Sequence, residues 1–433
     1  MNVLVRLGRF ALAILSVTLL MGAFGQNLFA ATVVVGNCRN LVQFATISDA
    51  IAAVPSGSVI QICPGTYHEQ LSINKSLTLT GVPSGTSDAI VILPPSGGLT
   101  GNATSLSSGN PIAAHVGVLG PATVNMNNII VDSIGNGQSG CSPPTLVGIL
   151  YQNATGTLNH VVTRNQWVGA SESDTASNGC QTGLGIFAQS GSGGTSKLSV
   201  IASSVHDYQK NGITGNEVGT TLTVINSDVV GQGATNGAAE NGVQIGFGAA
   251  GSVTGSLVID DVWAPDTITD PGDAAAGILL FDASTGNATV KNNTVGNTQF
   301  GIAAVTDTSG DGDGASITQN KVFGTRIFDA IDVCVNNSVV QSNTIMNSSE
   351  SAIHLDASCG STGSGNTVSQ NVIVDACTGV LQDSGASGNT ITPNTYNATV
   401  KTTGSSCTPA PSARVGAKAG AAGAATHHSP IRP

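Results

Sequence analysis

A short phrase that recurs along the middle of the chain restricts the possible folds more than any other feature of the sequence. The phrase is Gly or Ala followed by Ile or Val, and successive copies lie 22 to 37 residues apart. The copies are Gly148-Ile149, Gly185-Ile186, Gly212-Ile213, Gly242-Val243, Gly277-Ile278, Gly301-Ile302, Ala330-Ile331, Ala352-Ile353 and Gly379-Val380. A repeat of fixed period does not tolerate such variable steps. A solenoid of stacked β coils does, because each coil contacts only its neighbours and its loops vary freely in length.

A second phrase precedes most copies of the first, and it consists of a small polar residue, any residue, and then Val or Ile. Its polar residues are Asn127, Asn159, Ser203, Ser227, Asp260, Asn293, Asn320, Asn343, Asn371 and Asn389. The two phrases predict two strands of one coil, in which the Val or Ile points inward and its neighbours point outward. The small polar residues are expected to stack along the axis as a hydrogen-bonded ladder.

The composition agrees with a β solenoid and excludes several other classes. Only 9% of the 433 residues are charged and 56 are Gly, which is unlike a helical protein, while 40% hydrophobic residues is too many for a disordered chain. The net charge is −11 with only 14 Lys and Arg, so no basic surface is expected to bind nucleic acid. The same charge would repel acidic glycans unless calcium or a local basic patch intervened.

The region that precedes the repeats has a pattern of its own. Residues 46–54 place Ile47, Ala50 and Ile51 on one face and predict a short amphipathic helix with Thr46 or Ser48 as its N-cap. Such a helix would cover the open end of a solenoid.

Residues 46–81 resemble the opening of the pectin-lyase-like β-helix superfamily, above all its NosD-like and pectinesterase-like members. The matching elements are Thr46-Ile47, Ala50-Ile51, Pro64-Gly65-Thr66-Tyr67, Glu69, Ile73, Lys75 and the run from Leu77 to Gly81. The resemblance implies a right-handed parallel β-helix in a secreted or periplasmic protein that handles polysaccharides. It implies a fold more than a reaction, because function depends on the site that a fold carries.

The chain divides into three parts. Residues 1–30 are predicted to be a signal peptide, since Arg6 and Arg9 precede an apolar stretch and small residues surround Ala30. The alternative is a membrane anchor, for which the apolar run is short. Residues 31–403 are predicted to form one β-helix domain, and residues 404–433, rich in Ala and Gly, a disordered tail. We therefore expect a secreted or periplasmic monomer with no membrane span after cleavage.

Eight cysteines after a signal peptide predict disulfides. Proximity along the chain favours Cys38–Cys63 and Cys141–Cys180. The remaining four are left with three possible pairings, and they are Cys334, Cys359, Cys377 and Cys407.

The catalytic motifs of the resembled superfamily are mostly missing, so the register of the coils has to nominate a site. Residues one and three positions after the Ile or Val of the first phrase should point outward. This register places Asp332 and His354 on adjacent coils, Asp356 two residues along from His354, and Asp383 above Asp356. A His between carboxylates can act as a general base, so Asp332, His354 and Asp356 are the candidate catalytic residues. Arg326, Asp329 and Glu350 are placed at the same edge.

Two alternatives to this catalytic site stay open. The residues can be solvated polar groups on an exposed sheet face, or the register can slip by one residue and turn them inward. Three aromatic residues in bends are further candidates for stacking on sugar rings, namely Trp167, Tyr208 and Trp263.

A candidate metal site lies in the segment from Asp307 to Gly314. Asp307, Asp311 and Asp313 alternate with Gly, a pattern that suits oxygen coordination of calcium. Thr318 stands where an EF-hand carries its bidentate carboxylate, so a polar turn is the alternative. Calcium is the one cofactor that the sequence suggests.

Three functions are compatible with the sequence. The first is a secreted β-helix protein that contacts extracellular or cell-envelope polysaccharide without established catalysis. The second is a carbohydrate-active enzyme, a polysaccharide lyase, esterase or glycosidase, that uses Asp332, His354 and Asp356. The third is a structural or adhesive surface solenoid.

Overall fold

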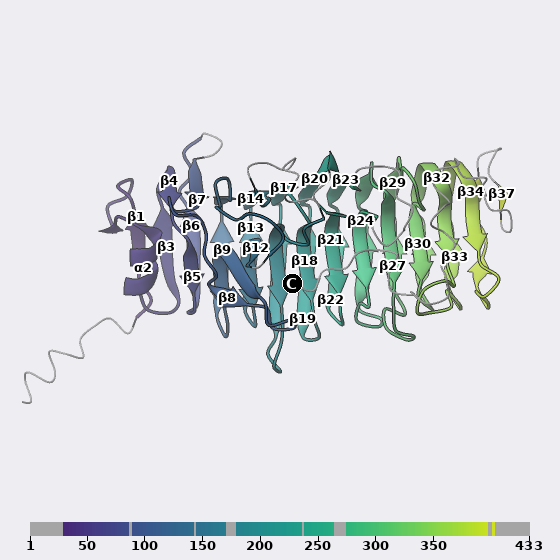
Figure 1. The fold of residues 1–433 in the computed structure, drawn as a ribbon, viewed down its shortest axis with the longest axis horizontal. Coiled ribbons are helices and arrows are strands. Elements are labelled where there is room, and N and C mark those ends of the chain that lie inside the picture. Colours follow the sequence, from purple (N-terminus) through teal and green to yellow (C-terminus); the bar gives the residue numbers. More distant parts are fainter. Residues whose placement is uncertain are drawn as a thin grey trace, which may run out of the picture.

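The chain folds into an elongated right-handed parallel β-helix, seen in the computed structural model (Figure 1). The structure describes residues 29–85, 89–142, 144–169, 179–235, 238–263, 274–396 and 401–402. Within these residues there is one helix, α2 (Ile47–Ala53), and the strands pair almost entirely in parallel. The exception is the antiparallel pair of β8 and β9. The predicted fold class is confirmed.

One sheet contains fourteen strands, and successive coils contribute them in order. In sheet order they are β2 (Val42–Phe44), β1 (Thr32–Val35), β3 (Ser58–Ile62), β6 (Leu77–Gly81), β10 (Thr123–Asn127), β13 (Thr155–Asn159), β16 (Ser196–Ile201), β19 (Thr220–Ile225), β22 (Ala250–Thr254), β25 (Ala288–Lys291), β28 (Ser316–Thr318), β31 (Val339–Gln341), β33 (Thr367–Ser369) and β35 (Thr390–Ile391).

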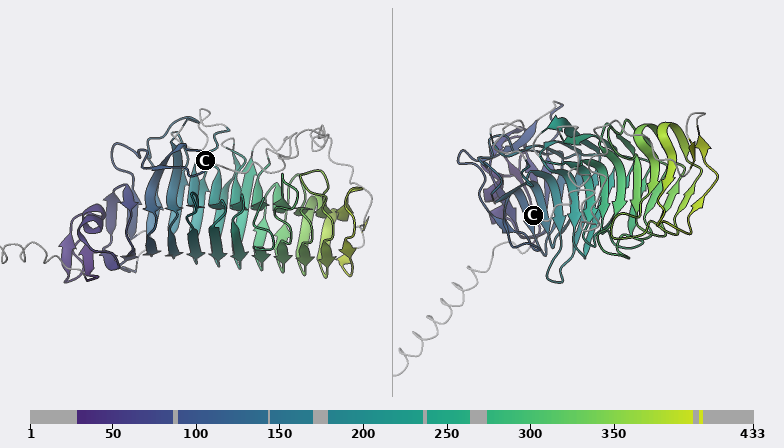
Figure 2. Two further views of the ribbon diagram at one scale, coloured as in Figure 1. Left: turned by 90° about the horizontal axis from the view of Figure 1, so that it is seen from below. Right: turned by 45° about the vertical axis from the view of Figure 1, so that its right-hand side comes forward.

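The other strands form a sheet of twenty-three strands that wraps the remaining sides of the coils (Figure 2). They are β4 (Gly65–His68), β5 (Leu71–Ile73), β7 (Ile90–Leu93), β8 (Ala103–Thr104), β9 (Pro111–Leu119), β11 (Ile130–Asp132), β12 (Thr145–Gln152), β14 (Val162–Gln166), β15 (Leu184–Gln189), β17 (Ser204–Tyr208), β18 (Asn211–Asn216), β20 (Asp228–Thr235), β21 (Asn241–Gly246), β23 (Leu257–Trp263), β24 (Ala276–Phe281), β26 (Thr294–Gly296), β27 (Phe300–Val305), β29 (Lys321–Phe323), β30 (Ile331–Cys334), β32 (Thr344–Leu355), β34 (Val372–Gln382), β36 (Thr395–Tyr396) and β37 (Lys401–Thr402).

The Gly/Ala-Ile/Val phrase marks the same position in every coil, as predicted. Its apolar residues pair in one unbroken column, which is Ile149, Ile186, Ile213, Val243, Ile278, Ile302, Ile331, Ile353 and Val380. All of them are buried in the core. The column supplies one of the apolar rows that together form the core.

The preceding glycines are required by close packing rather than by an unusual backbone angle. A Cβ at Gly242 would lie 2.3 Å from Val258 Cγ1 and 2.7 Å from the carbonyl oxygen of Gly277 on the next coil. Such contacts force the backbone or the neighbours to move. At this position Gly242 leaves no room for a side chain, whereas the coils of β30 and β32 accommodate Ala330 and Ala352.

The polar ladder is real, but it contains different residues in some coils than the sequence pattern suggested. The side-chain carbonyl oxygens of Asn320 and Asn343 accept from the side-chain amides of Asn293 and Asn320, respectively, at 3.0 Å. Each of the three asparagines also donates to a backbone carbonyl of the preceding coil at 2.8–2.9 Å. The full ladder is Ser203, Ser227, Ser256, Asn293, Asn320, Asn343, Asn371 and Asn394.

Four predicted members of this ladder were therefore wrong. Ser256, and not Asp260, accepts from the amide of Ser227. Asn389 belongs to a second, shorter ladder, in which it accepts from the amide of Asn366. Asn127 and Asn159 pair with each other in β10 and β13, two residues before the ladder position. The errors arise because loops of unequal length separate the two phrases, so a similar tripeptide can match at the wrong corner.

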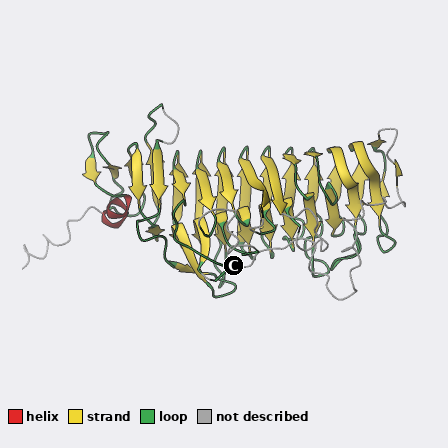
Figure 3. Ribbon diagram, turned by 45° about the horizontal axis from the view of Figure 1, so that its top comes forward, coloured by secondary structure: helices red, strands yellow, loops and turns green. Residues whose placement is uncertain are grey.

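The capping helix is confirmed, and it lies at the N-terminal end of the stack (Figure 3). The Thr46 hydroxyl accepts from the amide of Asp49, while the Glu69 carboxylate accepts from the amides of Ile47 and Ser48. At the other end of the helix the Lys75 ammonium donates to the carbonyl of Val54. Glu69 and Lys75, two residues of the superfamily resemblance, thus hold opposite ends of the helix where its dipole favours their charges.

Both predicted disulfides are present, Cys38–Cys63 and Cys141–Cys180. A third, Cys334–Cys359, resolves part of the open pairing. Cys377 is also disulfide-bonded, and Cys407 lies outside the described residues.

The predicted signal peptide and tail lie almost wholly outside the described residues and stay predictions. Among the described residues, no helix has both the length and the apolar character needed to cross a membrane.

Candidate functional site

The register places the predicted residues together at the C-terminal end of the stack. Asp332 on β30 pairs directly with His354 on β32, and His354 pairs with Leu381 on β34. Asp356 follows the end of β32, and Asp383 follows the end of β34. The adjacency of Asp332 and His354 is therefore confirmed, and the register slip is excluded for these coils.

His354 is held between two carboxylates. Its Nδ1 lies 3.0 Å from Asp329 Oδ2, and its Nε2 lies 3.3 Å from Asp383 Oδ1. Backbone amides hold both acids in turn, since Ser351 donates to Asp329 Oδ1 and Ala357 donates to Asp383 Oδ2. The ring is thus fixed by a chain of hydrogen bonds that crosses three coils.

This geometry fixes the charge of the ring. Burial by itself lowers the pKa of His354, but the charge of Asp329 and the hydrogen bonds with Asp329 and Asp383 outweigh it and raise that pKa well above its ordinary value. The hydrogen bond from His354 is the main cause that lowers the pKa of Asp383 to about 2. At neutral pH the site therefore holds an imidazolium between two carboxylates, an arrangement in which the ring donates protons rather than accepting one.

Asp332 is in the opposite state. Its side chain is 1% exposed, and burial, followed by the charge of Asp356, raises the pKa of Asp332 well above its ordinary value. Burial therefore favours the neutral, protonated form of this carboxyl group. Asp356 is also buried, and its Oδ1 accepts from the amide of Ser358 at 2.6 Å.

We call the set of five side chains the Asp/His cluster; its members are Asp329, Asp332, His354, Asp356 and Asp383. They bring ligand atoms close enough together to hold a cation. One atom each of Asp329, Asp332 and His354 lie within 4.8 Å of one another, and so do atoms of His354, Asp356 and Asp383. A cation would have to displace protons that the cluster already shares, because both ring nitrogens of His354 face carboxylates.

The outward face of these coils is covered, contrary to the expectation of a solvated sheet face. The outward column runs through Leu150, Phe187, Thr214, Gln244, Leu279, Ala303 and Asp332, and all of these are buried. Loops gather on one side of the stack (Figure 2). The segment at Thr104–Ser107 is one cover, since the Gln189 side chain bonds to Leu106 and Ser107. Long loops therefore turn an outer sheet face into a second interior.

The predicted calcium residues do not converge. Asp307 and Asp311 are exposed, while the carboxylate of Asp313 accepts from the backbone and side-chain amides of Asn336. No group of three described residues that could reach one cation includes them. Asp282, which the sequence pattern did not single out, accepts from the amide of Asp307, and burial raises the pKa of Asp282 to about 6. Calcium binding stays a prediction.

A second buried polar group lies inside the stack and was missed. Tyr208 is fully buried, so it cannot stack on a sugar ring as expected, and its hydroxyl donates to Asp261 Oδ1 at 2.5 Å. Burial raises the pKa of Asp261 well above its ordinary value. Glu240 is buried too. Burial and the negative charges of Asp261 and Glu240 raise the pKa of Tyr208. The sequence signal was the Asp260-Asp261 pair, which was assigned to the ladder instead.

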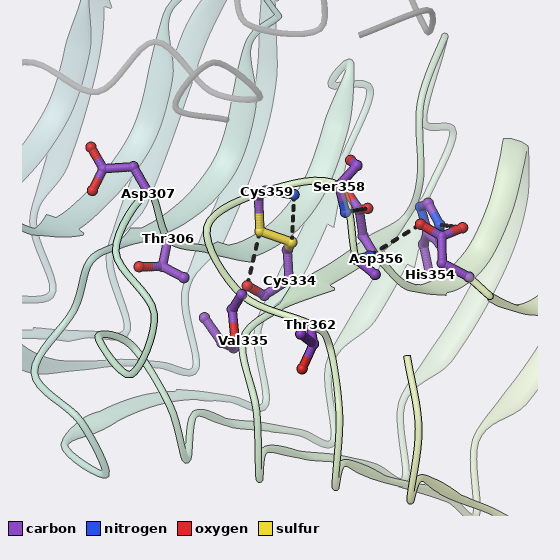
Figure 4. The surroundings of a disulfide bond; sticks show 12 residues. Thr306, Asp307, Cys334, Val335, His354, Asp356, Ser358, Cys359 and Thr362 are labelled. Atoms are coloured by element: carbon purple, nitrogen blue, oxygen red, sulfur yellow. Dashed lines mark hydrogen bonds and ion pairs between the residues drawn. A yellow bond between two sulfur atoms is a disulfide. The ribbon is translucent and has the colours of Figure 1, made fainter. Parts of the chain in front are cut away.

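A disulfide closes the Asp/His cluster on one side. Figure 4 shows the Cys334–Cys359 bond beside Asp356 and Ser358, with His354 on the next strand. Cys334 ends β30, two residues after Asp332, and Cys359 lies in the loop that follows β32. The disulfide therefore ties that loop to the strand that carries Asp332.

Comparison with known proteins yields similarity in structure alone. Neither a scan against protein-family models nor a search of curated protein sequences gives a match. Among solved structures, DFA-IIIase from Arthrobacter chlorophenolicus, without its lid and in complex with GF2, is 13% identical and has a TM-score of 0.52, with 86% of this chain and 99% of that chain covered. The Dettilon tailspike protein is 12% identical with a TM-score of 0.50, covering 82% of this chain and 63% of the other. A periplasmic alginate epimerase is 10% identical with a TM-score of 0.49, covering 83% and 81%. Together with the continuous parallel ladders, the similarity to the DFA-IIIase and to the tailspike shows that the chain has a right-handed parallel β-helix fold.

Proposed function

We propose that this chain is a β-helix protein that binds polysaccharide outside the cytoplasm. We propose further that the rim of the Asp/His cluster, formed by Asp383 and His354, is the place of contact. The β-helix DFA-IIIase that resembles it was solved in complex with GF2. Three disulfides among the described residues support an oxidising compartment, because reduced cytosols do not maintain such bonds.

The observation that carries the proposal is the gradient of exposure across the cluster. The Asp383 side chain is 35% exposed and that of His354 16%, while that of Asp329 is 4% exposed. A rigid carboxylate at the surface, oriented by an imidazolium beneath it, is a strong acceptor for sugar hydroxyls. Since the chain carries a net charge of −11 and the rim itself is anionic, we infer a neutral rather than an acidic polysaccharide.

A glycan array with three proteins tests this proposal. The wild type is expected to bind one class of neutral glycan, and Asp383→Asn is expected to weaken that binding about tenfold or more, the usual worth of a hydrogen bond to a charged group. Asp375→Asn is the matched control, because Asp375 lies on the same strand, β34, and is exposed away from the cluster. Binding that both variants lose equally, or a wild type that binds no glycan, would reject the proposal and favour a structural solenoid.

A second candidate function, acid–base catalysis on a glycosidic bond, is favoured by the opposite pKa shifts of two carboxyl groups. The pKa of Asp332 is raised, mainly by burial, while the pKa of Asp383 is lowered to about 2, mainly by the hydrogen bond from His354. Pairs of carboxyl groups with separated pKa values are typical of enzymes that use one as acid and the other as base or nucleophile. Asp332→Asn is expected to abolish release of reducing sugar from a glycan that the protein still binds. Unchanged release would exclude Asp332 as the acid.

A further inference from the structure

The two most buried acids of the Asp/His cluster lie beside a loop that bonds to the cluster. Asp332 is 1% and Asp356 2% exposed, although both lie on the outer side of the coil. The loop of residues 356–366 runs from β32 to β33 and begins with Asp356 itself. Its position therefore decides whether a ligand that contacts Asp383 can also reach Asp332.

The loop is anchored in two halves that depend on different groups. In the first half, Cys359 is bonded to Cys334, and the amide of Gly360 donates to the carbonyl of Thr306 at 2.8 Å. A Cβ on Gly360 would lie 2.2 Å from the carbonyl carbon of Asp307, so the first half packs tightly on the coil of β27, two coils earlier in the stack.

The second half is held by the Asn336 side chain together with other contacts, among them hydrogen bonds from the Asn337 amide to the carbonyl of Ser364 and from Asn389 Nδ2 to the carbonyl of Gly363. Asn336 Nδ2 donates to Ser361 Oγ at 2.6 Å. Asn336 Oδ1 accepts from the Thr362 hydroxyl at 3.0 Å and from the amide of Ser364 at 2.9 Å. These hydrogen bonds do not involve residues 357–360, the half of the loop that contacts the cluster.

The contacts of the first half with the cluster are direct. The amide of Ala357 donates to Asp383 Oδ2 at 3.1 Å, and the amide of Ser358 donates to Asp356 Oδ1 at 2.6 Å. Displacing residues 357–360 would thus remove a donor from each of the two carboxylates and admit water to the buried acids.

We propose that the Cys334–Cys359 disulfide is a latch that holds residues 357–360 over the Asp/His cluster and so controls access to Asp332 and Asp356. This inference rests on the proposed function for its biological meaning, but not for its test. The latch opens when a dithiol supplies two electrons and two protons: the S–S bond breaks, two thiols form, and the dithiol is oxidised to its own disulfide. The first half of the loop is then retained by the hydrogen bond from Gly360 to Thr306 and by the amide contacts of Ala357 and Ser358.

Carboxyl footprinting tests the latch directly. The folded protein is treated with a water-soluble carbodiimide and glycine ethyl ester, and labelling of each acid is read by mass spectrometry. We expect Asp332 and Asp356 to be labelled at least about tenfold more in the double variant Cys334→Ala, Cys359→Ala than in the wild type, because local opening exposes groups that global stability otherwise protects.

Two controls separate the latch from general loosening. Cys38→Ala, Cys63→Ala removes a disulfide at the far end of the stack, and Asn336→Ala removes three hydrogen bonds of the second half of the loop; neither should raise labelling of Asp332. Wild type treated with dithiothreitol repeats the experiment from the folded state, should the double variant fail to fold.

Labelling of Asp332 that stays at the wild-type level after loss of Cys334–Cys359, or that rises equally in the Cys38–Cys63 control, overturns the proposal. Because footprinting needs no glycan, the latch can fail while glycan binding stands, and glycan binding can fail while the latch stands.

Discussion

The asparagine ladder makes a quantitative prediction for one side chain, Asn320. Its Oδ1 accepts from the backbone and side-chain amides of Asn293, and its Nδ2 donates to Val290 and Asn343, giving four hydrogen bonds of 2.9–3.0 Å. Asn320 is 1% exposed, so Asn320→Ala leaves these partners buried without water. At roughly 1 kcal/mol for each net hydrogen bond, with further cost for the orphaned groups, we expect a loss of about 4 kcal/mol in the free energy of unfolding.

Urea unfolding followed by circular dichroism measures this loss, and amide exchange shows whether it is confined to the neighbouring coils. The matched control is Gln341→Ala, which removes the hydrogen bond from Gln341 to Gln370 on the exposed face of a nearby coil and should cost under about 0.5 kcal/mol. Asn320→Asp keeps the acceptor but loses the donors, so it should be more destabilising at pH 7 than at pH 3, where the carboxyl is neutral. A cost for Asn320→Ala no larger than that of Gln341→Ala would refute the ladder as a source of stability.

Two further predictions concern packing and a buried acid. Gly242→Ala should destabilise by about 2 kcal/mol in urea unfolding because its Cβ would collide with Val258, whereas Gly97→Ala, which meets nothing within 4 Å, should be neutral or slightly stabilising; equal effects would contradict the packing argument. Burial raises the pKa of Asp261 well above its ordinary value, so the protonated carboxyl is favoured more in the folded state than in the unfolded state. The cost in free energy of unfolding appears as pH rises above the pKa of the unfolded state. It grows until pH reaches the pKa of the folded state, by about 1.4 kcal/mol for each unit between the two pKa values. Asp261→Asn should therefore raise stability at pH 7 but not at pH 3, and a variant that is less stable at both pH values would show that the ionised form is the native one.

Much of the fold could be predicted because it depends on local chemistry that repeats. Ile331 and Ile353 mark the same point of successive coils, so Asp332 and His354, each one residue further, had to be neighbours. The helix at 47–53 was readable from its cap and apolar spacing. Such features need no knowledge of distant parts of the chain.

The parts that could not be predicted depend on loops and corners. Asp329 was placed only near the edge of the site, yet it makes the shorter hydrogen bond to His354, because the corner before β30 turns its side chain toward the next coil. The burial of Asp332 depends on which loops cover the outer face, and loop paths do not follow from a repeat. The same uncertainty about corners led the ladder to Asp260 instead of Ser256.

The most direct test of the account is the titration of His354 by NMR, read from the chemical shift of its Cε1 proton. The charge of Asp329 and the hydrogen bonds to Asp329 and Asp383 should keep the ring protonated at pH 7 with a pKa well above 6.5, and Asp329→Asn should bring that pKa down. Because the folded pKa is raised, the stabilisation from this group is complete below pH 6.5 and should be lost as pH rises through the folded value. A His354 ring that titrates at or below 6.5 in the wild type would contradict an imidazolium held between Asp329 and Asp383. It would also remove the support for an oriented carboxylate at the surface, on which the proposed glycan contact depends.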